Sequence, residues 1–186
     1  MKSVLISTRP KLVEKICHKI GEDETGKAIY EKRIEVRNTA PQEVPFKCYI
    51  YETKGQYVKF THGAHTKYGY GRGKVIGWFV CNSVDEYPYD YCDGVDIDDD
   101  TILETAIDRE DINIYAKGKT LYGWHISDLK IYNNPRALSE FFKPCDRFLD
   151  CCTCRRLVHN EYMSCDNKIT RPPLSWCYVE DLGEEE

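Results

Sequence analysis

Short hydrophobic runs separated by charged or glycine-containing segments dominate the chain, a pattern that favours strands over long helices. Residues 3–7 are typical of a buried strand, and residues 74–81 form the strongest strand pattern in the sequence. Residues 33–37 alternate apolar with charged side chains, so the charged residues of this short strand share one face of a sheet. Further strands are predicted at 46–51, 121–132 and 175–179.

Three helices are predicted from apolar spacing and from residues that start or stop helices. Pro10 fits the first turn of a helix, and Gly21 is expected to end that helix. Thr101 and Glu104 have the spacing of a capping box, which opens a short helix to about Arg109. Pro135 is expected to start the third. The apolar faces of the first and third helices are Leu12, Val13, Ile16, Cys17 and Ile20, and Leu138, Phe141 and Phe142.

The remaining segments and the order of elements indicate the fold class. Residues 21–32 predict an exposed excursion, and residues 55–73 predict a long exposed hairpin or loop. The sequence contains no internal repeat, and it lacks the regular strand–helix alternation of a doubly wound sheet. We therefore expect an α+β fold, with helices packed on a small β-barrel of mixed or antiparallel strands.

The composition fits one ordered domain. The chain has 186 residues, 41% of them hydrophobic, and 14 tyrosines, which excludes disorder for most of its length. No stretch approaches the roughly 20 apolar residues of a membrane helix, and the apolar run at the N-terminus is too short for a signal peptide. We expect a soluble, cytoplasmic protein.

Charge is divided unevenly along the chain. The net charge of −5 combines +7 in residues 1–80 with −12 in residues 81–186, so the first half can supply a basic face for nucleic acid. Within the acidic run from Asp85 to Asp111, the spacing of Asp96, Asp98 and Asp100 resembles the start of a calcium loop. However, Thr101 replaces the required glycine and Ile107 replaces the final carboxylate. A solvated acidic helix start is the plain interpretation. A DNA-mimicking or partner-repelling surface is the alternative.

Two segments carry candidate residues for binding nucleic acid. Glu35 and Arg37 lie two apart on the predicted strand, and an arginine can pair with a phosphate through two hydrogen bonds. The alternative is a solvated edge strand with an ordinary ion pair. Residues 62–74 interleave cations with aromatic residues, as single-stranded nucleic acid requires, or form only a flexible hairpin. The complete candidate set is Arg9, Lys11, Lys32, Glu35, Arg37, Lys67, Tyr70, Arg72 and His125, the last of which is alternatively a structural histidine.

Half of the ten cysteines cluster near the C-terminus, within residues 145–165. Without a signal peptide these thiols are expected to be reduced, so a metal is considered before a disulfide. The C-x-x-C spacing of Cys151 and Cys154 lets two thiolates reach one structural Zn²⁺, which Cys145 and Cys165 could complete. Cys152 and His159 are competing ligands, and unligated or redox-labile thiols are the alternative.

Several segments in order along the chain resemble the ASCH domain family of the PUA-like superfamily, in particular its longer bacterial and phage-type members. The resemblance covers residues 1–88, 119–142 and 171–182. It rests on the first strand followed by residues 9–11 (RPK), which open a helix, and on residues 32–37 (KRIEVR), 45–51 (PFKCYIY), 73–77 (GKVIG), 122–126 (YGWHI) and 171–179 (RPPLSWCYV). It implies a single domain over residues 1–182, with an acidic helical insertion at 93–118, a cysteine-rich insertion at 145–170 and a frayed tail at 183–186.

The family resemblance also implies a function. Its members are regarded as RNA- or nucleotide-binding, with the ligand in a cleft beside the first helix. One branch hydrolyses an acetylated cytidine with a lysine, a threonine and a glutamate; Lys32 stands at the lysine, but Glu35 replaces the threonine and residues 77–79 offer no acid. We therefore expect binding of RNA or a modified nucleotide without catalysis. The alternatives are an enzyme on an acylated nucleoside, with Lys32 as base, and a phage or host regulator that binds a protein.

Overall fold

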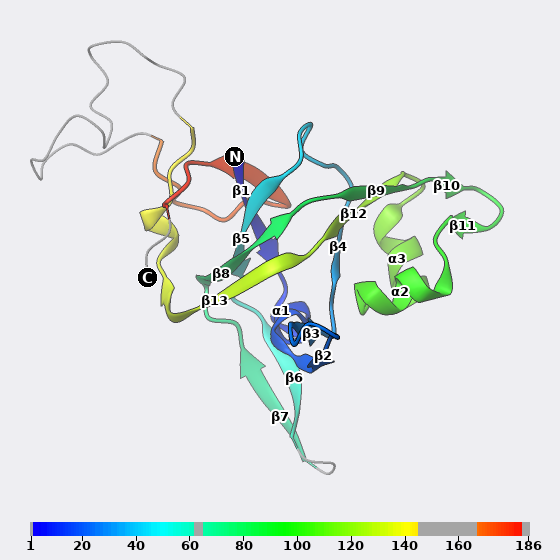
Figure 1. The fold of residues 1–186 in the computed structure, drawn as a ribbon, viewed down its shortest axis with the longest axis horizontal. Helices are drawn as coiled ribbons and strands as arrows, with labels where there is room; N and C mark the ends of the chain where they lie inside the picture. Colours follow the sequence, from blue (N-terminus) through cyan, green and yellow to red (C-terminus); the bar gives the residue numbers. More distant parts are fainter. Residues whose placement is uncertain (1, 62–64, 145–166, 184–186) are drawn as a thin grey trace, which may run out of the picture.

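A five-stranded sheet forms the centre of the molecule (Figure 1). The structure is a computed structural model that describes residues 2–61, 65–144 and 167–183. The strand order is β13-β8-β5-β1-β14; β1 and β5 are parallel and the other neighbours antiparallel. The strands span Lys2–Thr8 (β1), Phe46–Glu52 (β5), Lys74–Cys81 (β8), Ser127–Arg136 (β13) and Trp176–Val179 (β14).

A second sheet and three ribbons complete the β-structure of the described residues. The second sheet has the order β4-β12-β9, from Ile34–Arg37 (β4), Leu121–His125 (β12) and Val84–Tyr87 (β9). The ribbon of β6 and β7 extends away from both sheets in Figure 1. The ribbons are β2 (Lys19–Glu22) with β3 (Ala28–Tyr30), β6 (Gln56–Thr61) with β7 (His65–Tyr70), and β10 (Tyr89–Asp90) with β11 (Gly94–Val95).

The helices are short. α1 (Pro10–Cys17) follows β1 directly and buries Val13 and Ile16. α2 (Asp99–Thr105) and α3 (Arg109–Ala116) lie together on the second sheet, and a single 3-10 turn follows β13 (Leu138–Glu140). In the described residues, no helix is long and apolar enough to cross a membrane.

Hydrophobic residues cover both faces of the central sheet, because successive side chains of a strand point to opposite sides. On one face Val4 and Phe46 pack with Trp124 of the second sheet, whose ring lies 5.1 Å from that of Phe46 in an edge-to-face contact. On the other face Leu5 and Tyr49 pack with residues that follow β13 and precede β14. A third cluster joins α2 and α3 to the second sheet.

The expectation of an α+β fold is confirmed, but the described strands form two separate sheets and no closed barrel. β14 and β4, the edge strands that would close the barrel, share no ladder. The Arg37 side chain instead donates from β4 to the Ser7 and Ser175 carbonyls at 3.1 and 3.3 Å. A guanidinium thus occupies the seam that backbone hydrogen bonds would otherwise close.

Four predicted elements differ from the structure. The helix expected to open at the capping box of Thr101 and Glu104 begins instead at Asp99, because the Asp98 side chain caps it by accepting from the Thr101 N–H, and it ends at Thr105. The first helix ends at Cys17, because residues 19–30 form a strand ribbon that leaves Ile20 exposed. The strand predicted at 121–132 is two strands, since the chain changes sheets between His125 and Ser127. The helix expected from Pro135 is absent: this proline lies in edge strand β13, where a missing N–H costs no ladder bond, and only the 3-10 turn follows.

Candidate functional site

Lys32, Glu35 and Arg37 form a buried ion cluster beside β4. Their exposed fractions are 0%, 3% and 6%. Glu35 lies between the two cations: its Oε1 is 2.6 Å from Arg37 Nη2, and its Oε2 is 3.4 Å from Lys32 Nζ. The alternative of a solvated edge strand is therefore wrong, because all four residues of β4 are buried.

Lys32 is held inside the protein by two hydrogen bonds and one ion pair. Its Nζ donates to the Ile34 and Thr105 carbonyls, both at 2.7 Å, and lies 3.4 Å from Glu35 Oε2, which accepts no hydrogen bond within the described residues. The ammonium has no exposed surface through which it could reach a ligand. Lys32 therefore joins β4 to the end of α2 and does not line an open cleft.

Burial and charge shift the titration of this cluster. Burial lowers the pKa of Lys32, and Glu35 opposes that shift. Burial alone would raise the pKa of Glu35, but the adjacent Arg37 and Lys32 outweigh it and lower that pKa below its usual value. The carboxylate is therefore ionised at neutral pH.

Unpartnered polar atoms gather where Arg37 crosses the seam. Arg37 Nε and Asn38 Oδ1 are buried and have no hydrogen-bond partner among the described residues, and the buried Ser175 Oγ adjoins the Tyr115 hydroxyl. Thr8 Oγ1 accepts from Arg37 Nη2 at 3.2 Å on the same side. Such groups are costly unless something binds them, so this seam, which we call the Arg37 slit, is a candidate ligand site.

Tyr115 of α3 lies at the edge of the Arg37 slit. Burial raises the pKa of its phenol, and the neighbouring Arg37 lowers it in part. The Asn38 backbone and the Ser175 side chain adjoin its hydroxyl. Tyr115 is 39% exposed, so it can contact both the slit and a bound molecule.

An exposed basic patch surrounds the start of α1 and the base of the β6–β7 ribbon. A methyl group on Gly71 would overlap the Pro10 ring, and one on Gly73 would overlap the Lys54 side chain, so these segments touch. The α1 patch consists of Arg9, Lys11, Lys54, Arg72 and Lys74, all exposed. Of these, Arg72 lies near the buried Glu52, with 3.7 Å between Nε and Oε2; the other four have no ion-pair partner within the described ranges.

The predicted ligand set is thus divided between two places that meet at one point. Arg9, Lys11 and Arg72 belong to the α1 patch, whereas Lys32, Glu35 and Arg37 are buried. The two places adjoin, since Thr8 contacts Arg37 and Arg9 is the next residue and the N-cap of α1.

The other predicted residues lie elsewhere or outside the described side chains. Lys67 and Tyr70 belong to β7, where the backbone register pairs Lys67 with Lys59 and Tyr70 with Gln56; their side chains lie outside the described part. His125 Nε2 lies 2.7 Å from Asp85 Oδ2, and this carboxylate makes its surroundings unfavourable for phosphate.

The zinc expectation falls outside the described residues. Cys145, Cys151, Cys154 and Cys165 all lie within 145–166, as do the competitors Cys152 and His159. In the part of the chain that the structure describes, no three His, Cys, Asp or Glu side chains are grouped as metal ligands. Structural zinc stays a prediction.

The sequence missed Asn38, Ser175 and Tyr115. Asn38 directly follows the predicted strand, and Ser175 was placed within the last strand, yet no local pattern indicates that the two meet. Tyr115 lies within residues 84–118, which we call the acidic segment and which carried no nucleic-acid signal. Lys54 and Lys74 adjoin the predicted hairpin and could have been found from their charge.

Comparisons with known proteins assign the fold. No known family matches the sequence, and no curated protein matches it. A crystal structure of ASCH from Zymomonas mobilis superposes with a TM-score of 0.52 at 15% identity, covering 96% of this chain and 88% of that chain. A tyrosine-to-phenylalanine variant of that protein gives 0.52 at 14% identity, with 97% and 91% covered, and a serine-to-alanine variant gives 0.52 at 14%, with 96% and 89%. The chain has the ASCH-domain fold, as its sequence indicated.

Proposed function

We propose that this chain, whose fold is that of the ASCH domain, binds RNA: the α1 patch holds the phosphate backbone, and the Arg37 slit receives polar groups of one nucleotide. The observation that carries the proposal is that the α1 patch and the slit meet at Thr8 and Arg9. Phosphate contacts position a strand, whereas the unpartnered donor and acceptor of the slit suit the polar edge of a base or a ribose.

The state of Lys32 supports binding without hydrolysis. A lysine that acts as a base or nucleophile must give up a proton and reach the substrate. Lys32 has no exposed surface, and its Nζ is surrounded by two carbonyls and Glu35. The alternative of an enzyme on an acylated nucleoside would require this whole cluster to open.

The test for the α1 patch is the salt dependence of binding to labelled single-stranded RNA, measured by fluorescence anisotropy. Five phosphate contacts predict a slope of about −3.5 for log K against log salt. Arg9→Ala and Arg72→Ala are each expected to weaken binding to RNA of every sequence and to make the slope shallower by about 0.7. Arg109→Ala is the matched control, because Arg109 is a half-exposed arginine paired with Asp99 in the acidic segment.

The test for the slit is Asn38→Ala. Asn38 Oδ1 has no partner among the described residues, so its removal is expected to leave the free energy of unfolding unchanged or slightly higher. RNA affinity is expected to fall, because a ligand would lose an acceptor. The proposal would be contradicted if the protein bound no RNA, or if neither Arg9→Ala nor Asn38→Ala changed its affinity for RNA.

A further inference from the structure

A pocket of about 580 Å³ lies at the other end of the seam that contains the Arg37 slit. Ala40 and Gln42 line it from the loop after β4, Trp176 and Tyr178 from β14, and Lys2 and Ser3 from β1. The two places are separated by a hydrogen bond from Trp176 Nε1 to Thr39 Oγ1 at 2.9 Å. The pocket is therefore a place distinct from the slit.

Packing holds the aromatic side of the pocket in position. The rings of Trp176 and Tyr178 meet edge to face, 5.3 Å apart at 87°. The buried Trp124 supports Trp176 from the core, with the ring centres 5.8 Å apart. Both pocket aromatics are only partly buried, so each retains surface for a ligand. Held aromatic rings are surfaces on which bases of any sequence stack.

The charges around the pocket balance, which argues against a phosphate. Lys2 Nζ is already paired with Glu43 at 3.0 Å, and it lies 5.9 Å from the Tyr178 ring. The Asp181 carboxylate also lines the pocket and accepts from Tyr49 at 2.6 Å and from Lys47 at 3.0 Å. A free anion would meet no unpaired cation there, whereas an uncharged planar group would meet no electrostatic penalty.

Uncommitted polar groups complete the pocket. Gln42 is exposed and makes no side-chain hydrogen bond to another described residue, so its amide can both donate and accept. Ser3 is buried, with an exposed fraction of 3%, and its hydroxyl has no hydrogen-bond partner in the described part of the chain. Aromatic surface with an adaptable amide is what recognition of an unstacked base requires.

We propose that this pocket binds a nucleobase, either of a free nucleoside or of a nucleotide unstacked from an RNA strand. For the RNA source alone, this inference rests on the proposed function. Ser175 of the slit directly precedes β14, and Val179, the last residue of β14, lines the pocket. The slit and the pocket therefore lie along one strand of four residues, which is about 13 Å long. A strand that enters the slit can therefore place a neighbouring base in the pocket.

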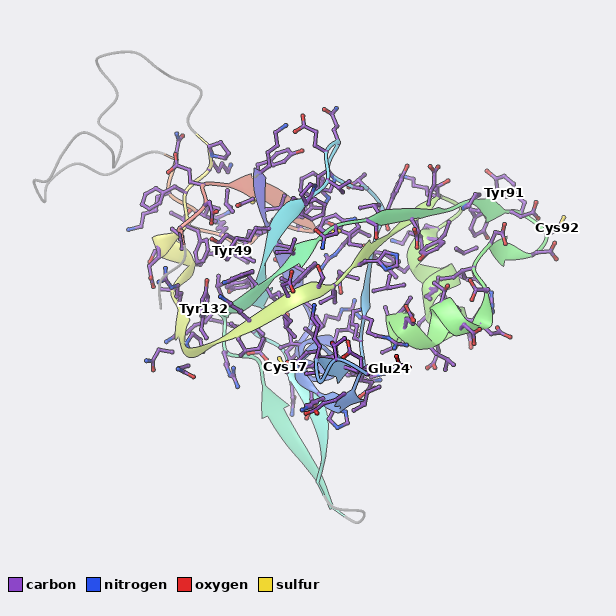
Figure 2. All side chains as sticks on the ribbon, viewed as in Figure 1. Cys17, Glu24, Tyr49, Tyr91, Cys92 and Tyr132 are labelled. Atoms are coloured by element: carbon purple, nitrogen blue, oxygen red, sulfur yellow. The ribbon has the colours of Figure 1, made fainter. Side chains whose placement is uncertain are left out.

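The first experiment measures saturation transfer by NMR from the full-length chain to adenosine, guanosine, cytidine and uridine. At least one nucleoside is expected to receive transfer at its base protons. Tyr178→Leu is expected to weaken that nucleoside's affinity about tenfold, the usual cost of removing a stacking partner. Gln42→Ala is expected to weaken it roughly threefold to tenfold, because the base loses a hydrogen bond. Tyr91→Leu and Asn134→Ala are the matched controls, since both residues are exposed and neither lines the pocket; Tyr91 lies beside β10 (Figure 2). Gln42→Ala changes only an exposed loop residue, so it keeps the test valid if Tyr178→Leu does not fold.

The second experiment compares RNA with the same strand carrying abasic positions. If RNA supplies the base, abasic substitution is expected to weaken binding about tenfold for the natural chain and by less for Gln42→Ala, in which the base has already lost its hydrogen bond to the amide. The protein could bind a nucleoside in a way that requires Gln42 and yet bind no RNA. That result would support the pocket and contradict the proposed function. No transfer to any nucleoside, together with equal affinity for abasic RNA, would overturn the pocket while salt-dependent RNA binding through the α1 patch could persist.

Discussion

At the scale of single residues, Arg37 makes a connection that lysine could not reproduce. Its guanidinium pairs with Glu35 while donating to the Ser7 and Ser175 carbonyls and to Thr8 Oγ1. A guanidinium has five donors in a fixed plane, whereas an ammonium has three on one nitrogen. One side chain can therefore link the two sheets, while its Nε–H donates to no described residue.

Glu35 is expected to contribute more to stability than any surface carboxylate, because its loss leaves two buried cations facing each other. We expect Glu35→Gln to lower the free energy of unfolding by about 3 kcal/mol at pH 7, measured by urea denaturation. Glu104→Gln is the control, since Glu104 pairs with Arg33 at 3.0 Å near the surface. That change should cost less than about 1 kcal/mol.

The same pair of variants predicts a pH dependence. The pKa of Glu35 is lower in the folded protein than in the unfolded chain, so the unfolded state binds a proton first as pH falls. The contribution of Glu35 is complete above about pH 4.5 and is lost as pH falls through the folded pKa. The unfolding free energy of Glu35→Gln should therefore fall less steeply below pH 4.5 than that of the natural chain. Equal slopes would show that Glu35 titrates normally.

At the scale of elements, Gly71 determines how the β6–β7 ribbon is seated on α1. A Cβ there would lie 2.6 Å from Pro10 Cγ and would overlap the Thr53 carbonyl oxygen. The backbone would have to move, so Gly71→Ala is expected to lower the free energy of unfolding by about 2 kcal/mol. It should also weaken RNA binding by separating Arg72 from Arg9. Gly21→Ala, with no atom within 4 Å of the new methyl group, should leave both quantities unchanged.

The cysteine-rich segment predicts a metal content that can be measured directly. Protein purified without chelator is expected to contain about one zinc per chain by elemental analysis, because four thiolates complete a tetrahedral site. Cys151→Ser with Cys154→Ser should remove the metal. Cys17→Ser with Cys92→Ser should retain it, since these two exposed cysteines lie outside the cluster. Zinc far below one per chain in the natural protein would leave unligated thiols as the interpretation.

The positions of the buried strands could be predicted from the sequence more readily than the ends of the strands or the strands with which they pair. The runs at 3–7, 46–51 and 74–81 reappear as β1, β5 and β8, because a short buried strand needs only local hydrophobicity. The change of sheet after His125 depends instead on pairing with β4 and β9 on one side and with β8 on the other. No local pattern contains that information.

The candidate site shows the same division. Glu35 and Arg37 were expected together because a strand places alternate residues on one face. Their burial was not expected, because it depends on β1 and on Ser175, which are far away in the sequence. The chain segments that carry Arg9 and Arg72 come together because Gly71 lets the ribbon approach Pro10.

At the scale of the whole molecule, opposite charges occupy adjoining parts. The acidic segment, residues 84–118, carries twelve acidic and two basic residues. The segment packs against the basic end of the chain, since Lys15 of α1 donates to the Ala106 carbonyl at 2.7 Å and Arg33 pairs with Glu104. α1 has eight residues and is about 12 Å long, so the α1 patch begins about that far away. The segment should therefore weaken RNA binding from a distance.

Neutralising exposed carboxylates of the acidic segment is expected to strengthen RNA binding at low salt. Asp93→Asn, Asp96→Asn and Asp100→Asn in one variant remove three exposed negative charges. At 0.01 M salt, where charges act over about 30 Å, affinity should rise roughly threefold to tenfold. At 0.5 M salt the gain should disappear, because screening then acts within a few ångströms. Aspartate-to-glutamate changes at the same positions keep the charge and should keep the affinity. A gain that persists at high salt would mean that these residues touch the RNA, which would place the binding surface on the acidic segment and not around α1.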